Sequence, residues 1–209
     1  MTRTLTRLAA AACIALAALP TRAEIVVDNL SQPVEGESTF STLLVGQAFA
    51  TGSNAGMLTS VVLPLSSRGT TAFTLTIHPY STTSFPAAIA TIGTLTVTTA
   101  THYTFTPATA IPMPANTSFW LVANVIVINV GWGFTMSTVF NGTGSIPTDP
   151  TAAGSVDGGA SFSEAYTTAD GVHQMQVNIA PIVVPEAGTL ALLGVGCSVL
   201  GTILVRRRK

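Results

Sequence analysis

The chain has 209 residues, of which only 8% are charged, and its basic residues lie almost entirely at the two ends. Between residues 24 and 181, eight acidic side chains accompany a single basic one, Arg68, which gives this segment a formal charge of −7. Because binding to nucleic acid or to anionic lipid headgroups needs basic surface that neutralises phosphate, this charge excludes nucleic acid as a partner and disfavours anionic lipids.

The first 23 residues have the three parts of a secretory signal peptide. Two arginines within the first seven residues supply positive charge, and residues 8–19 form an apolar stretch that is too short to span a bilayer. Thr21 and Ala23 then place small residues three and one positions before a cleavage point. We therefore expect export through the Sec translocon and cleavage between Ala23 and Glu24.

The composition of residues 24–181 favours an all-β domain. Thr and Ser dominate the polar side chains, and β-branched Thr suits pleated strands. Lysine is absent, so the usual residues of exposed helix faces are scarce. Cys13 and Cys197 lie in the hydrophobic end segments, so this domain has no disulfide, no thiol nucleophile and no cysteine metal cluster.

Hydrophobic patterning predicts several strands in this domain. The continuous apolar runs at residues 58–65 and 119–128 indicate strands that are buried on both faces. Alternation of apolar and polar residues indicates half-buried strands at residues 73–78, 102–106 and 174–179. In the first two of these, His78 and His102 fall on the solvent-facing side.

Turn residues separate the predicted strands. Asn141-Gly142, Asp157-Gly158-Gly159 and Asp170-Gly171 are typical turn sequences. We expect nine or ten strands in an antiparallel, jelly-roll-like β-sandwich that spans residues 24–181 as one domain. Residues 140–160 are rich in Gly, Thr, Pro and Ala, and they are predicted to form a long mobile loop.

Five segments taken in order resemble the choice-of-anchor R domain, a bacterial surface domain that is joined to different C-terminal anchors. These segments are residues 24–30, 46–52, 58–63, 103–107 and 115–122, and the similarity covers most of residues 24–134. The resemblance implies an exported β-sandwich module, and it brings no catalytic residues to this sequence.

The C-terminal segment, residues 182–209, combines three features in a fixed order. Val184-Pro185-Glu186 is followed by an uncharged apolar run at residues 187–205 and then by the basic tail Arg206, Arg207, Arg208 and Lys209. A helix of this run would be ~28 Å long, which matches the hydrocarbon core of a bilayer. The basic tail would hold its own end of this transmembrane helix in the cytoplasm.

This order of features resembles the PEP-CTERM sorting signal of Gram-negative bacteria. The family motif is usually Val-Pro-Glu-Pro, and Ala187 stands here where the second proline belongs. The resemblance implies an exosortase-type processing enzyme as a partner, which cleaves near Glu186. The alternative is a permanent single-pass anchor in the inner membrane.

The spacing of histidines, serines and acidic residues gives no clear signal for a metal site or a catalytic nucleophile. His78, His102 and His173 lack the spacing of metal ligands, and no Gly-x-Ser-x-Gly nucleophile motif occurs. Asp149, Asp157 and Asp170 lie in Gly-rich segments, where they serve either a calcium site or, in the favoured interpretation, turns. We therefore expect no catalytic residues, no metal and no cofactor.

Aromatic residues offer one further kind of site, a surface on which sugars stack. Trp120 lies in a strong apolar run, which predicts a core position, whereas Trp132 is flanked by Gly131 and Gly133 and is predicted near the surface as a possible glycan contact.

These features predict an exported surface or extracellular-matrix protein that is not an enzyme. It is anchored in the inner membrane before processing, and its role is structural or adhesive. One alternative is a carbohydrate-binding module for exopolysaccharide, which exposed aromatic residues would favour. The other is a secreted enzyme, which would need His78 or His102 beside an acidic residue in a cleft.

Overall fold

The computed structural model describes residues 23–39, 44–67, 69–125 and 130–182. In these ranges the elements in chain order are β1 (Glu24–Asp28), β2 (Gly36–Thr39), β3 (Leu44–Ala50), β4 (Gly56–Ser67), β5 (Thr71–Pro79), β6 (Ala90–Val97), β7 (Thr101–Phe105), β8 (Ile111–Met113), β9 (Ser118–Val125), β10 (Val130–Thr135), β11 (Ala152–Ser155), β12 (Glu164–Tyr166), the 3₁₀ helix η1 (Thr168–Asp170), β13 (Val172–His173) and β14 (Gln176–Pro181).

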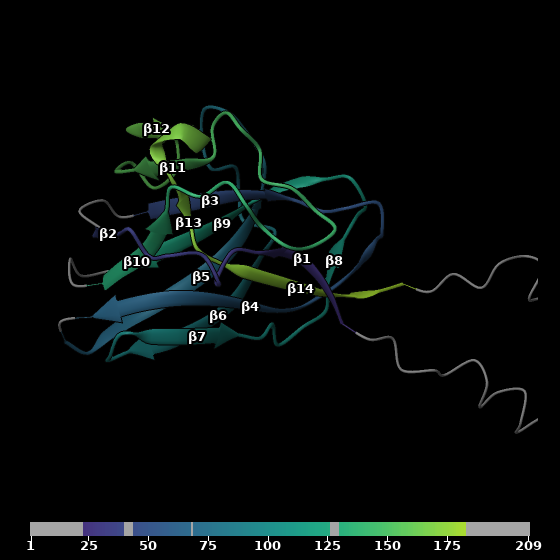
Figure 1. Ribbon diagram of the computed structural model, residues 1–209, viewed down its shortest axis with the longest axis horizontal. Helices are drawn as coiled ribbons and strands as arrows, with labels where there is room; N and C mark the ends of the chain where they lie inside the picture. Colours follow the sequence, from purple (N-terminus) through teal and green to yellow (C-terminus); the bar gives the residue numbers. More distant parts are fainter. Residues whose placement is uncertain (1–22, 40–43, 68, 126–129, 183–209) are drawn as a thin grey trace, which may run out of the picture. The chain divides into compact units, whose positions relative to one another are not determined.

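The strands form two antiparallel sheets (Figure 1). Sheet A has the order β1-β14-β4-β10-β13, with β2 paired to β10 and with β7 and β8 paired to β4. Sheet B has the order β12-β11-β3-β9-β5-β6. The prediction of an all-β antiparallel fold is confirmed, while the jelly-roll-like connectivity stays a prediction.

The main core lies between the inward faces of the two sheets. Phe73 of β5 in sheet B and Phe105 of β7 in sheet A bring their ring centroids to 5.5 Å. Alternate residues of β5, including Leu75, and alternate residues of β4, including Leu63, are fully buried in the same cluster. Burying each such large apolar side chain contributes roughly 1.5–3 kcal/mol. The described residues from Ala23 to Pro181 form one compact unit around this core.

A second, smaller hydrophobic cluster covers part of the outer face of sheet B. Ala48, Trp120 and Val122 alternate with core residues on β3 and β9, so they point away from the main core. Phe85 packs over them, and the backbone of β3 admits its ring because residue 46 is glycine: a Cβ there would lie 2.5 Å from Phe85 Cε1. This part of sheet B is therefore buried on both faces.

The two apolar runs behave differently. The prediction for residues 119–128 holds over residues 119–123, which are buried on both faces, whereas Asn124 is exposed and residues 126–129 lie outside the described ranges. The prediction for residues 58–65 is wrong, because Leu63 and Leu65 are buried while Val62 and Pro64 between them are only half-buried. Among the described residues, no second hydrophobic cluster covers the outer face of sheet A at this point.

The prediction of a long loop at residues 140–160 holds only in part, and its mobility stays a prediction. Residues 136–151 contain isolated bridges but no strand, whereas residues 152–155 are regular structure. This segment contains β11, whose four residues are all buried and which pairs with β3 and β12. Before β11, Gly144 donates its N–H to the carbonyl of Val26 at 2.8 Å, and Ser145 exchanges hydrogen bonds with Ala50. The segment therefore connects β1 of sheet A to β3 of sheet B.

The predicted turns are present. Gly142, Gly158, Gly159 and Gly171 all have positive φ angles, which glycine adopts without steric strain. Within the described ranges, no helix is long and apolar enough to cross a membrane. The predicted signal peptide and the predicted helix at residues 187–205 lie outside those ranges.

Candidate functional site

The residues of the two predicted targeting signals are largely outside the described part of the chain. Val184, Pro185, Glu186 and the basic tail belong to residues 183–209, which the structure does not describe. At the other end, β1 begins at Glu24, and the Glu24 carboxylate accepts hydrogen bonds from Asn54 Nδ2 at 3.0 Å and Thr143 Oγ1 at 2.5 Å. Among the described residues, the first strand thus begins directly after the predicted cleavage point, and the cleavage itself stays a prediction.

Trp132 is buried, which corrects the sequence prediction that it lies near the surface. Its side chain has 0% exposure in the main core, and its indole Nε1–H donates to the carbonyl of Gln174 at 2.7 Å. The flanking glycines do not expose the ring, because β10 pairs with β2 and β4 along this stretch. Trp120 is fully buried, as predicted.

The three histidines lie in three different environments. His102 is exposed, as its strand pattern predicts. The same prediction for His78 is wrong, because Phe85 and Pro86 cover its face of sheet B. Its ring nitrogens lie 2.8 Å from Thr76 Oγ1 and 2.6 Å from the carbonyl oxygen of Pro86. Burial lowers the pKa of His78, and the hydrogen bond to Pro86 partly opposes this shift.

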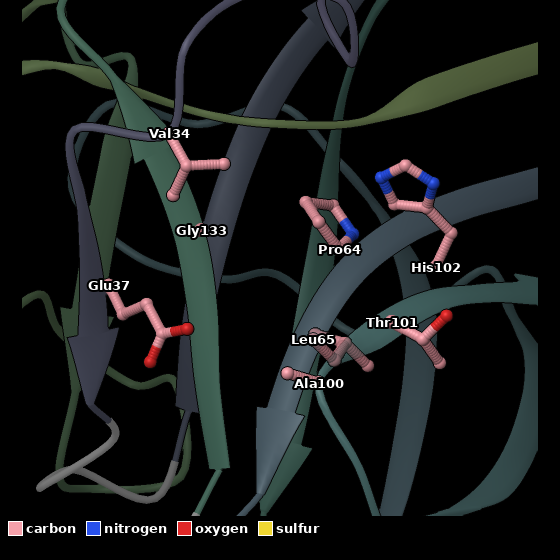
Figure 2. A pocket seen from close by; sticks show the side chains of 8 residues that line it. All are labelled: Val34, Glu37, Pro64, Leu65, Ala100, Thr101, His102 and Gly133. Atoms are coloured by element: carbon pink, nitrogen blue, oxygen red, sulfur yellow. The ribbon is translucent and has the colours of Figure 1, made fainter.

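An open hollow of about 260 Å³, the outer trough, lies on the outer face of sheet A (Figure 2). It is lined by Val34, Glu37, Pro64, Leu65, Ala100, Thr101, His102 and Gly133. In Figure 2, Pro64 lies between the carboxylate of Glu37 and the imidazole of His102. Glu37 also accepts a hydrogen bond from Ser66 Oγ at 2.7 Å. The trough therefore combines an apolar floor with one acidic and one basic group.

A second hollow of about 210 Å³, the His173 cleft, lies where strands of both sheets meet η1. It is lined by Ser38, Phe134, Ala152, Tyr166, Asp170, Gly171 and His173. Tyr166 is 39% exposed and donates its hydroxyl to Glu164, and this hydrogen bond is the main cause that raises the pKa of Tyr166 to about 12. The phenol consequently stays protonated at physiological pH.

Gln47 determines the protonation pattern of His173. Gln47 Nε2 donates to the carbonyls of Ala48 at 3.0 Å and Thr151 at 2.9 Å, so Gln47 Oε1 is directed to His173. That oxygen accepts from the backbone N–H of His173 at 2.8 Å and lies 3.3 Å from its ring Nδ1. Since an amide oxygen only accepts, the ring proton is on Nδ1, and Nε2 of the neutral ring is an acceptor.

The Nε2 atom of His173 is a buried acceptor that makes no hydrogen bond to any described residue. The residue as a whole is 6% exposed, and its ring packs at a centroid distance of 4.7 Å from Trp132. Burial lowers the pKa of His173 to about 4, so the ring is neutral under physiological conditions. Ser38 lines the same cleft, and a catalytic serine would donate its hydroxyl to a neighbouring histidine. Ser38 makes no such hydrogen bond to His173 Nε2.

Two of the three acidic residues considered for calcium, Asp157 and Asp170, accept hydrogen bonds within local turns. Asp157 accepts hydrogen bonds from Ser161 and Ser155, and these bonds hold its pKa well below the usual range. Asp170 accepts from the backbone and hydroxyl of Thr167 at 2.9 Å each, which lowers its pKa in the same way. In the part of the chain that the structure describes, no three His, Cys, Asp or Glu side chains gather into a metal-binding group.

Sequence reasoning did not single out Gln47 and His173 as a pair. They are separated by 126 positions, and only the packing of sheet A against sheet B brings them together. The local sequence Val172-His173-Gln174-Met175 offers no signal for such a contact, because it does not show which polar residue is turned inward.

The comparisons with known proteins identify the C-terminal end alone. A scan against protein families matches residues 183–209 to the PEP-CTERM protein-sorting motif. This motif indicates an exported protein that is sorted through exosortase. A search of curated proteins found no match.

Proposed function

We propose that this protein is a non-catalytic structural or adhesive component of the cell surface or extracellular matrix. The observation that carries the proposal is the PEP-CTERM motif at residues 183–209, which follows directly on a β domain whose last strand ends at Pro181. Residues 1–23 direct the chain to the Sec translocon, and residues 187–205 hold it in the inner membrane until exosortase acts. The β domain at residues 24–181 is then released to the surface or matrix.

The properties of the β domain support this role. Its charge of −7 suits an exported protein that has to stay soluble and avoid anionic polymers. The similarity of its opening segments to the choice-of-anchor R domain supports the same assignment.

The processing step is tested by the substitution Glu186→Gln in a host that contains exosortase. We expect membrane insertion to continue, because the apolar helix is unchanged, and processing to decrease, because the recognition motif has lost its charge. Immunoblotting with an antibody against residues 206–209 measures the uncleaved fraction. Glu164→Gln, the same substitution on an exposed strand, is the matched control and leaves processing unchanged. If the surface-exposed wild-type protein keeps Lys209, the permanent anchor is correct and processing is not.

A carbohydrate-binding module for exopolysaccharide is the second function that the geometry favours. The observation in its favour is that two hollows, the outer trough and the His173 cleft, offer hydroxyl, carboxylate and imidazole groups beside apolar walls. Such a combination suits sugars, which present hydroxyl groups around apolar ring faces. Co-sedimentation of the full chain with exopolysaccharide from the producing strain tests it, and a chain that stays in the supernatant at every polymer concentration contradicts it.

A further inference from the structure

We infer that the His173 cleft binds a single neutral sugar ring through its hydroxyl groups, with His173 Nε2 as the acceptor of one hydroxyl. This inference rests on the carbohydrate-binding function proposed above, and it assigns that function to one of the two hollows. Its basis is an unpaired acceptor that is buried in the lining of a cleft. A buried polar atom without a partner destabilises the protein, and a ligand donor at that position removes this destabilisation.

The chemistry of the acceptor selects the kind of donor. Because Gln47 keeps the ring proton on Nδ1, Nε2 accepts a hydrogen bond and does not donate one. The ligand must therefore supply an O–H or N–H group. An ionised carboxylate offers acceptors only, and the Asp170 carboxylate in the lining repels carboxylate and phosphate groups alike.

The other lining residues fit a sugar ring. Ser38 and Asp170 supply a hydroxyl and a carboxylate for further ligand hydroxyls, and the exposed ring of Tyr166 supplies an aromatic surface for an apolar sugar face. The cleft volume of about 210 Å³ lies below the range of roughly 300–1,000 Å³ that is typical of drug-sized ligands. One ring, rather than an oligosaccharide, is the size that this volume admits.

Access to Nε2 requires a small movement of the cleft wall, because the atom itself is buried. Strand β12 is the wall best placed to move. It is the edge strand of sheet B, its one strand partner among the described residues is β11, and all three of its residues are exposed. Its displacement costs few buried contacts. The cost of this movement weakens binding of a single sugar ring.

The experiment measures sugar binding to the full chain by calorimetry, in a detergent without a sugar headgroup. The probes are glucose, galactose, N-acetylglucosamine and glucosamine, followed by exopolysaccharide. His173→Phe removes the acceptor while keeping a buried aromatic ring, and His102→Phe is the matched control in the outer trough. We expect at least one monosaccharide to bind wild type and His102→Phe equally, and to bind His173→Phe about tenfold or more weakly.

Several results would overturn the inference. If His173→Phe binds the sugar as tightly as wild type, or if only His102→Phe loses affinity, the sugar site does not lie in the His173 cleft. If exopolysaccharide binds and no monosaccharide does, the cleft assignment fails while carbohydrate binding stands; if neither binds, both fail. Should His173→Phe not fold, ¹⁵N NMR of wild-type histidines decides: a hydrogen bond from the sugar shifts the Nε2 resonance of His173, and an unchanged resonance at saturation contradicts the inference.

Discussion

Trp120 and Trp132 are both fully buried, but their surroundings differ in kind. Trp120 lies on the outer face of sheet B, where the rings of Tyr80, Phe85 and Phe162 pack around it at centroid distances of 5.3, 5.4 and 5.5 Å. Trp132 lies in the main core beside His173, whose Nε2 has no partner in the described part of the chain.

The indole N–H of each tryptophan is satisfied, by the carbonyl of Ser81 at 3.0 Å for Trp120 and of Gln174 at 2.7 Å for Trp132. The difference therefore lies in the neighbours and not in the tryptophans. Around Trp120, stability depends on volume and shape. Around Trp132, it depends also on the protonation state of a buried imidazole, so the two regions respond to different perturbations.

Removing the ring of Trp120 gives the largest expected effect. We expect Trp120→Ala to lower the free energy of unfolding by about 3–5 kcal/mol, because it leaves a cavity among three aromatic rings. It also leaves the carbonyl of Ser81 without its donor. Urea denaturation measures the change, and Val34→Ala, at a side chain that is 59% exposed, is the control with little effect. A loss below about 1 kcal/mol would show that the second cluster contributes little to stability.

Low pH should lower the stability of the region around Trp132 and His173. The pKa of His173 is about 4 in the folded protein against an ordinary value of 6.5, so the unfolded chain takes up a proton first as the pH falls. The contribution of neutral His173 to the free energy of unfolding is fully present above pH 6.5. It is lost as the pH falls towards 4, by an amount on the order of 3 kcal/mol. The lowered pKa of His78 acts in the same direction.

Comparison of wild type with His173→Phe isolates the contribution of His173. Urea denaturation at several pH values between 7 and 4 should show a clearly smaller loss of stability in the variant, whereas Trp120→Phe should keep the acid dependence of wild type. Identical pH slopes for wild type and His173→Phe would contradict the assignment of this effect to His173.

The smallest expected effect tests the close packing beneath Phe85. Gly46→Ala places a Cβ 2.5 Å from the Phe85 ring, which has to move. Such overpacking costs about 1–3 kcal/mol, measurable by thermal unfolding. A second change, Phe85→Leu, should cost less in the Gly46→Ala background than in wild type, because the clash is already relieved. Strict additivity of the two changes would refute the proposed contact.

Local patterns predicted the regular parts of the fold well. The alternation of Phe73, Leu75 and Ile77 predicted the inward face of β5, since side chains of a strand alternate between its two faces. The Gly-containing turn sequences also formed turns, because positive φ angles depend on the residue itself. The alternation did not show which outward face another segment covers, and His78 was predicted to be exposed because the cover by Phe85 and Pro86 leaves no trace in the strand pattern.

The sequence by itself determined the all-β class, the main strand faces and turns, and the C-terminal sorting motif, because each depends on residues that are neighbours along the chain. Only the tertiary structure decided that Trp132 is buried, that residues 152–155 form a strand, and that Gln47 contacts His173. Burial and hydrogen-bond partners are set by segments that meet across two sheets, and no local period encodes which segments those are.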